Sequence, residues 1–152
     1  IAVLQKYVRQ PLVANQVQFS IPVSNLVANG MEVNMETPGS VDHDGSLLDY
    51  CRLHDITLQA WSPFQMPSWK GCFLGSDEYP ELNQKIRVLA EKYGVSDTTI
   101  AAAWILRHPA NIQLVTGTAS EKRLKEIIAA CNITLTREEW YELYLAAGHP
   151  LP

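Results

Sequence analysis

Residues 112–120, which read IQLVTGTAS, have the composition of a short buried strand followed by a turn that contains glycine. Residues 121–126 continue as a helical segment with Arg123 in its first turn. A helix start presents unpaired backbone N–H groups and the positive end of the helix dipole to an anion. The guanidinium of Arg123 adds forked donors that match phosphate oxygens. The segment therefore indicates a phosphate-binding site, and its pattern is also that of an ordinary strand-to-helix connection.

The bulk composition is that of a globular protein with one domain. Of the 152 residues, 47% are hydrophobic and 18% are charged, and the net charge is −4. The chain has no basic stripe that could neutralise a nucleic-acid backbone. No apolar run approaches the ~20 residues that would span a bilayer. We therefore expect neither a nucleic acid nor a membrane as a partner.

Cysteines and histidines are too dispersed to predict a metal site, because none has the spacing of a C-x-x-C pair or a zinc finger. We expect the thiols to be buried or half-buried in a reducing cytoplasm, and the histidines to lie on the surface or in loops. These residues are Cys51, Cys72 and Cys131, and His43, His54, His108 and His149.

Apolar periodicity, prolines and capping residues predict alternating helices and strands. The predicted strands are residues 12–20, 56–62 and 112–116, and the predicted helices are residues 1–9, 47–54, 80–93, 97–107, 121–131 and 137–147. Gly94 ends one helix, Ser96 caps the next, and Thr136 with Glu139 forms a capping box. Residues 24–44 are predicted to be a long polar loop, of the kind that acts as a lid or is disordered.

Strands that alternate with helices predict an α/β fold with parallel pairing. This pattern is compatible with a small open sheet and with part of a (β/α)8 barrel. A complete barrel needs about 250 residues, so a barrel of this length would be partial.

The carboxyl ends of the strands carry polar and aromatic side chains, and ligands of α/β proteins gather at such ends. Gln16 offers an amide that can pair with a carboxamide, and Trp61 offers a flat face for a planar ring. Ser62, Thr118 and Ser120 offer hydroxyls to phosphates. Each feature alone is ordinary, but in this order they describe a site for a nicotinamide dinucleotide.

With these residues in place, the chain resembles the carboxyl-terminal half of the aldo-keto reductases, which are NADP(H)-dependent (β/α)8 barrel oxidoreductases, and is most similar to their bacterial branch. The resemblance covers nearly all of residues 1–152 and implies strands six to eight of the TIM barrel with their helices. The segments that carry it are Asn15-Gln16-Val17, residues 60–63 (AWSP), 90–96 (AEKYGVS), 102–107 (AAWILR) and 116–120 (TGTAS), and Arg123.

The resemblance implies roles at the nicotinamide end of the cofactor. Gln16 would contact the carboxamide, and Trp61 would stack on the ring and fix which face transfers hydride. Ser62, Pro63 and Phe64 would lie along the pyrophosphate.

At the adenosine end, Gly117, Thr118 and Ala119 correspond to the phosphate turn. Arg123 would bind the 2′-phosphate or stack on adenine, and Glu126 would meet the adenine amino group.

Two positions depart from the family pattern. Ile127 stands where the family often has an amide, and Gly117 stands near a basic residue of many members. The resemblance therefore implies NADP(H) and leaves NAD(H) open.

The family's catalytic Asp, Tyr, Lys and His lie on strands two to four. No tyrosine of this chain occupies a matching motif, so we assign no catalytic residue and expect the chain alone to be inactive. It is interpreted as a fragment or truncated product of a reductase that converts an aldehyde or ketone to an alcohol. The alternative is a noncatalytic module that binds a nucleotide or pairs with another half barrel. In either case, open strand edges predict self-association or pairing with the missing half.

Overall fold

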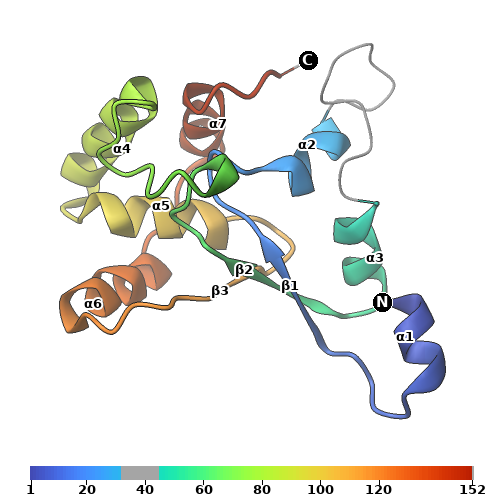
Figure 1. Cartoon of the computed structure of the whole chain (residues 1–152). Coiled ribbons are helices and arrows are strands. Elements are labelled where there is room, and N and C mark those ends of the chain that lie inside the picture. The colour runs from blue at the N-terminus through green and yellow to red at the C-terminus, as the bar shows by residue number, and fades with distance from the viewer. Residues whose placement is uncertain (32–44, 152) are drawn as a thin grey trace.

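The computed structural model describes residues 1–31 and 45–151 (Figure 1). Its strands are β1 (Ala14–Gln18), β2 (Thr57–Trp61) and β3 (Gln113–Leu114). Its α-helices are α1 (Ala2–Tyr7), α2 (Asn25–Met31), α3 (Leu47–Leu53), α4 (Pro80–Tyr93), α5 (Asp97–Leu106), α6 (Glu121–Ala129) and α7 (Arg137–Ala146). Short 3-10 helices are η2 (Pro67–Trp69) and η3 (Ala130–Asn132).

The strands form a parallel sheet in the order β1-β2-β3. Gln18 pairs with Trp61 on β2, and Gln59 pairs with Gln113 on β3. Helices connect β1 to β2 and β2 to β3 and also follow β3, which confirms the predicted α/β class. β3 is shorter than predicted, and only Gln113 and Leu114 pair with β2.

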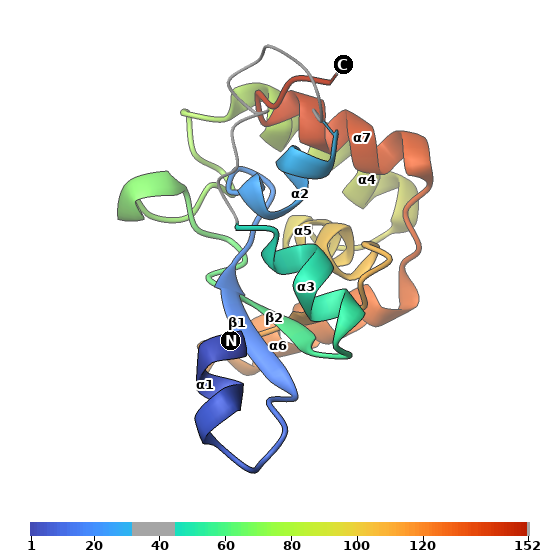
Figure 2. The same ribbon diagram turned by 90° about the vertical axis from the view of Figure 1, so that its right-hand side faces the viewer.

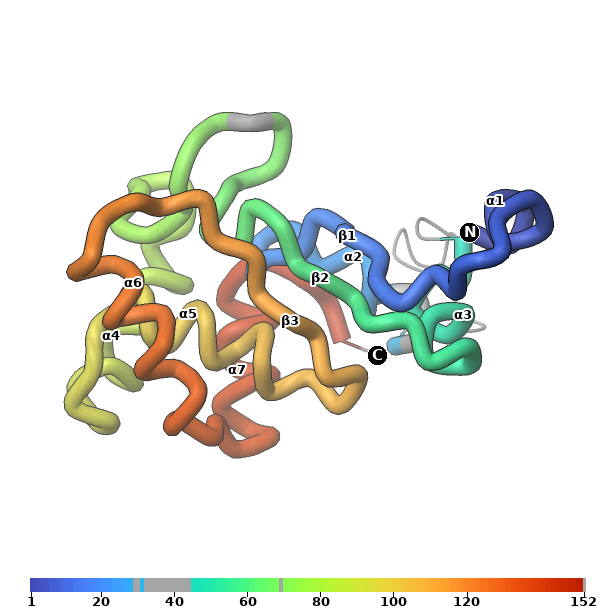
Figure 3. Tube along the Cα trace, turned by 90° about the horizontal axis from the view of Figure 1, so that it is seen from below, coloured from blue at the N-terminus to red at the C-terminus, as the bar shows by residue number. Residues whose placement is uncertain are grey.

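One face of the sheet is covered by helices and the other is open. Leu58 and Ala60 point into the helical layer and are buried. Side chains alternate along a strand, so their neighbours point the other way. This opposite side, the open face, bears exposed or half-buried residues, namely Ala14, Gln16, Gln18, Thr57, Gln59, Trp61 and Gln113. Figures 2 and 3 show α5 and α7 together on one side of the strands.

Helix α5 lies at the centre of the helical layer, where it contacts α4, α6 and β3. Its sequence is apolar on all sides, which is the pattern of a helix surrounded by protein. The predicted burial is confirmed for Ile100, Ala101, Trp104 and Ile105, each of which is 0% exposed.

Trp104 and Trp140 join α5 to α7 through reciprocal hydrogen bonds. Each indole Nε1 donates to the backbone carbonyl of the other residue at 3.0 Å, and the rings stack with centroids 4.6 Å apart. The Trp104 carbonyl lies in the last turn of α5, where carbonyls lack a partner within the helix. The indole of Trp140 therefore stacks on the ring of Trp104 and also provides a hydrogen-bond donor for a carbonyl at the end of α5.

Local capping signals place several helix ends as predicted. Gly94 ends α4 in the left-handed conformation with a φ of 67°. The Ser96 hydroxyl accepts the Thr99 backbone N–H at 3.2 Å and starts α5. The capping box of Thr136 and Glu139 is confirmed, with its reciprocal bonds at 3.2 and 2.7 Å.

The predicted loop at residues 24–44 is wrong in its first part, where the chain forms α2. The helix buries Leu26, Val27 and Ala28, so an apolar contact with the core outweighs the weak helix propensity of asparagine and glycine. The rest of the predicted loop, residues 32–44 with His43, lies outside the described residues.

The expectation of buried or half-buried thiols is correct for one cysteine and wrong for two. Cys51 is buried, whereas Cys72 and Cys131 are exposed. Burial raises the pKa of the Cys51 thiol, and a hydrogen bond with Asn15 opposes part of that rise.

No helix among the described residues is long and apolar enough to cross a bilayer.

The reciprocal indole bonds can be tested by replacing Trp104 with phenylalanine. Trp104→Phe keeps an aromatic ring but leaves the Trp140 carbonyl without its indole donor. We expect a loss of about 1–3 kcal/mol in the free energy of unfolding. Trp104→Ala should lose about 3–5 kcal/mol, because it also leaves a cavity. Urea denaturation measures both, with Leu53→Ala at an exposed helix position as the control. Equal stability of Trp104→Phe and the parent protein would contradict the assignment.

His108 should make stability depend on pH. Burial, with a smaller contribution from the nearby Arg52, lowers the pKa of His108 from 6.5 to about 4. Between these values the unfolded chain binds more protons than the folded chain, so the free energy of unfolding should fall as pH drops from 6.5 towards 4. His108→Gln should flatten this part of a pH series of urea titrations. Leu53→Ala, at an exposed residue that does not titrate, should keep the parent slope, and an unchanged slope in His108→Gln would refute the prediction.

Candidate functional site

The carboxyl ends of the three strands adjoin, and this brings the predicted site segments to one edge of the sheet. The Phe19 amide, just after β1, donates to the Trp61 carbonyl at 3.5 Å. The Val115 amide, just after β3, donates to the Ala60 carbonyl at 2.9 Å. The chain therefore leaves all three strands from neighbouring points, at the place where parallel α/β sheets hold their ligands.

Gln16 and Trp61 lie on the same open face of the sheet. Gln16 pairs with Gln59, and Trp61 follows Gln59 by two residues on β2, so the two side chains are diagonal neighbours. Gln16 is exposed and Trp61 is half-buried. A planar group on this face can meet an aromatic surface and an amide at once.

The turn after β2 has a constrained backbone. Ser62 has a positive φ of 51°, which is uncommon for a residue with a side chain. Its carbonyl accepts the Gln65 amide at 3.0 Å, while Pro63 is buried and Phe64 is half-buried. The Ser20 hydroxyl donates to the Gln65 carbonyl at 3.0 Å and ties this turn to the segment after β1.

Asn83 on α4 organises the loop that follows this turn and is not among the residues predicted from the sequence. Its side chain is 4% exposed, and its Oδ1 accepts the Gly75 amide at 2.8 Å. Its Nδ2 lies within 3.1 Å of the carbonyls of Phe73, Ser76 and Tyr79. A polar residue on the apolar side of a predicted helix was the available signal, since buried amides are almost always bonded.

Hydroxyl groups define the turn between β3 and α6. The Thr118 hydroxyl accepts the Ser120 amide at 3.2 Å, and the Ser120 hydroxyl accepts the Arg123 amide at 3.5 Å. Ser120 is therefore the N-cap of α6. The turn does not require glycine, because a Cβ at Gly117 would meet no atom within 4 Å.

The charges of α6 leave one cation without a carboxylate among the described residues. Lys125 pairs with Glu121 at 2.6 Å, and Lys122 lies 4.0 Å from Glu126. Both pairs are separated by one helical turn. Arg123 is exposed in the first turn, and no described carboxylate pairs with it. Its guanidinium is therefore available to an anion at the helix start.

Tyr93 and Lys92 lie against the carboxylate of Glu139, far along the helices from the strand ends. The Tyr93 hydroxyl donates to Oε2 at 2.7 Å, and Lys92 Nζ contacts Oε1 at 2.6 Å. The hydrogen bond to Glu139 raises the pKa of Tyr93, and burial raises it further. A proton donor in catalysis needs the opposite change, so this cluster is a structural link between α4 and α7.

The electrostatics of Glu139 support the same interpretation. Burial raises the pKa of this carboxyl, but hydrogen bonds from Lys92, Thr136 and Tyr93 outweigh burial and leave the pKa lowered. Glu139 therefore stays ionised and holds the two helices together.

His149 lies in the non-helical tail after α7 and is half-buried, which agrees with the expectation that the histidines occupy the surface or loops. Its Nε2 lies 2.7 Å from the Ile21 carbonyl and 2.8 Å from the Ser24 hydroxyl, and its ring packs on Tyr144. A carbonyl only accepts hydrogen bonds, so Nε2 carries the proton. In that state Nε2 cannot act as a base towards Ser24. The contact instead holds the carboxyl-terminal tail against the segment that follows β1.

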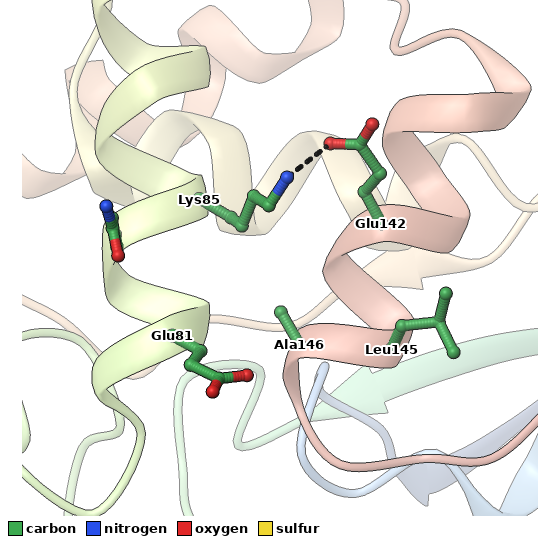
Figure 4. A pocket seen from close by; sticks show the side chains of 6 residues that line it. Glu81, Lys85, Glu142, Leu145 and Ala146 are labelled. Atoms are coloured by element: carbon green, nitrogen blue, oxygen red, sulfur yellow. Dashed lines mark hydrogen bonds and ion pairs between the residues drawn. The ribbon is translucent and has the colours of Figure 1, made fainter.

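An open groove of about 470 Å³ lies between α4 and α7 (Figure 4). Lys85 and Glu142 bridge it through an ion pair of 3.1 Å, and Leu145 and Ala146 form part of its wall. None of the predicted site residues lines this groove. The described residues also contain no group of three or more His, Cys, Asp or Glu side chains that could hold a metal ion.

Comparisons with known proteins agree on one family. The model of the Aldo/keto reductase family matches residues 4–144. A 6-dehydroglucose reductase of Agrobacterium fabrum is 30% identical over 146 residues, which are 96% of this chain and 42% of the relative. The chain thus spans less than half the length of that protein.

Solved structures show the same fold. A thermostable aldo-keto reductase crystallised with the inhibitor epalrestat matches 95% of this chain and 43% of its own, with a TM-score of 0.64 and 23% identity. An aldo-keto reductase from Klebsiella pneumoniae in complex with NADPH matches 92% of this chain and 40% of its own, with a TM-score of 0.62 and 22% identity.

Proposed function

This chain belongs to the aldo/keto reductase family, and we propose that it supplies the NADP(H)-binding part of an oxidoreductase that reduces an aldehyde or ketone to an alcohol. The observation that carries the proposal is the meeting of three strand ends at one edge, with Gln16 and Trp61 on one face and the start of α6 beside them. The NADPH complex of the Klebsiella pneumoniae protein supports the choice of cofactor.

The sheet is proposed to be strands six to eight of a (β/α)8 barrel, with residues 1–152 as part of one barrel domain. Two features support this. The open face bears polar side chains that a closed barrel would enclose, and the relatives have more than twice the matched length. A cytoplasmic location is proposed because all three cysteines are free thiols, as in a reducing compartment.

The residues suit the nicotinamide end of the cofactor. The half-buried ring of Trp61 would support the nicotinamide ring, and the exposed amide of Gln16 would pair with the carboxamide. Ser62, Pro63 and Phe64 would hold the pyrophosphate through the constrained turn after β2. The bound cofactor would supply hydride, and these groups would orient it.

The adenosine end is proposed to occupy the turn of Gly117, Thr118 and Ala119 and the first turns of α6. Arg123 would bind the 2′-phosphate, because its guanidinium has no carboxylate partner among the described residues. Glu126 would meet the adenine amino group in place of its long contact with Lys122.

Reduction of a carbonyl also needs a proton donor, and Tyr93 is unsuited to that task because its pKa is raised. The proton donor is therefore proposed to come from the part of the barrel that this chain does not contain. The second candidate function is a noncatalytic module that binds the nucleotide. A carbonyl-reductase assay of the chain with and without the remaining barrel half distinguishes the two, because the module would stay inactive in both.

Arg123 should set the preference for the 2′-phosphate. Arg123→Met should weaken NADPH binding about 10–100-fold, the range of a charged hydrogen bond worth about 1.5–3 kcal/mol. NADH lacks this phosphate and should lose far less. Fluorescence titration of both dinucleotides measures the ratio, with Arg137→Met in the first turn of α7 as the matched control.

Gly117→Lys tests the same preference in the opposite direction, because it adds a cation at a position where a Cβ would meet no atom within 4 Å. It should tighten NADPH binding relative to NADH. No NADPH binding by the parent protein would remove the cofactor proposal, whereas binding with an unchanged ratio in Arg123→Met would remove only the role of Arg123.

The edges of the sheet are proposed to pair with the missing half or with a second copy. β1 and β3 are edge strands, and the apolar residues of α1 beside β1 are solvent-exposed, with Val3 at 75% and Tyr7 at 77%.

Light scattering should report a mass above the monomer, and Tyr7→Lys should lower it. Leu53→Lys, at a residue that is 78% exposed on α3, should not. A monomer that melts cooperatively would count against pairing.

A further inference from the structure

Three glutamines form a row across the open face of the sheet. The register pairs Gln16 with Gln59 and Gln59 with Gln113, so one residue comes from each strand. Paired residues of parallel strands point to the same face, and neighbouring strands lie about 4.8 Å apart. The three amides, which we call the glutamine row, are therefore side by side.

The hydrogen bond between Gln59 and Gln113 sets which way the amide of Gln59 is turned. Gln59 Nε2 donates to Gln113 Oε1 at 3.0 Å. A primary amide carries its donor and its acceptor on opposite sides of one carbon. Since the nitrogen of Gln59 is turned to β3, its Oε1 is turned towards β1, where Gln16 lies. The group of Gln16 that complements this oxygen is its Nε2.

We infer that Gln59 and Gln113 are positioning residues that fix the amide orientation of Gln16 when a nicotinamide cofactor binds. Gln16 Nε2 donates to Gln59 Oε1, and Gln16 Oε1 is left to accept the NH₂ group of the carboxamide. The inference rests on the proposed function and adds to it which group donates and which accepts in the contact between Gln16 and the carboxamide. Without such a partner an amide can turn by 180° and present either its donor or its acceptor.

A bound cofactor would strengthen the hydrogen bonds of the glutamine row by excluding water from them. Gln16 and Gln113 are exposed and Gln59 is half-buried, so water reaches all three amides in the free protein, where the structure shows the bond between Gln59 and Gln113. A nicotinamide ring over Trp61 would cover the adjacent row and exclude that water. Hydrogen bonds gain strength in a less polar surrounding, and successive amides polarise one another.

A purely structural row is the competing explanation, because stacked glutamines also stabilise sheets. That role would change the stability of the fold and leave ligand selectivity unchanged. The two explanations therefore separate in the ratio of affinities for NADP⁺ and its 3-acetylpyridine analogue, which has an acetyl group where the carboxamide stands and cannot donate.

Calorimetric titration of the full chain with both ligands tests the inference. The parent protein should prefer NADP⁺ by about 5–10-fold, the value of one hydrogen bond of about 1 kcal/mol. Gln59→Leu should bring the ratio close to one, because Gln16 can then turn and donate to the acetyl oxygen. Gln59→Glu should keep the parent ratio, because its carboxylate still accepts from Gln16. Gln84→Leu, at an exposed glutamine on α4, is the matched control.

Thermal melts of each variant show whether it folds. If Gln59→Leu does not fold, Gln113→Leu on the edge strand replaces it and should lower the ratio about twofold through the loss of the terminal acceptor. An unchanged ratio in a folded Gln59→Leu or its replacement, or an equal loss in Gln59→Glu, overturns the inference. A parent protein that binds both ligands equally also overturns it and leaves the proposed function standing, whereas no binding of NADP⁺ removes both.

Discussion

Two indole rings, those of Trp104 and Trp140, stack inside the helical layer and each donates a hydrogen bond to the backbone carbonyl of the other. Phe19 packs on Trp104 with ring centroids 5.2 Å apart, and Tyr144 packs on Trp140 at 5.7 Å. This column runs from the end of β1 through α5 to α7. The layer behind the sheet and the first residue after β1 therefore share one rigid contact.

Because that layer holds one face of the sheet, the opposite face and the strand ends are free to bind a ligand. The burial of Leu58 and Ala60 fixes the register, and the register decides that Gln16 and Trp61 share the open face. A shift of one residue in either strand would send that strand's member of this pair to the core. Apolar packing behind the sheet thus determines which polar groups can meet a cofactor in front of it.

The charged residues form two groups with different roles, one between α4 and α7 and one on α6. Glu139 gathers Lys92 and Tyr93 at the junction of α4 and α7 and raises the pKa of the tyrosine, which is suited to holding helices and unsuited to giving up a proton. On α6 the lysines pair with carboxylates, and no carboxylate among the described residues pairs with Arg123. We propose that these residues bind a phosphorylated cofactor and that the proton chemistry of a reductase lies in the rest of the barrel.

Local periodicity and short motifs were sufficient to predict the alternation of strands and helices, the caps at Gly94, Ser96 and Thr136, and the family. The sequence by itself did not reveal α2, the role of Asn83 or the glutamine row. Each of these depends on which residues from distant segments meet: α2 forms because Leu26 and Val27 find the core, and Gln16, Gln59 and Gln113 align only through the register. Only the tertiary structure could decide them, since burial and pairing are set by neighbours that the sequence does not place.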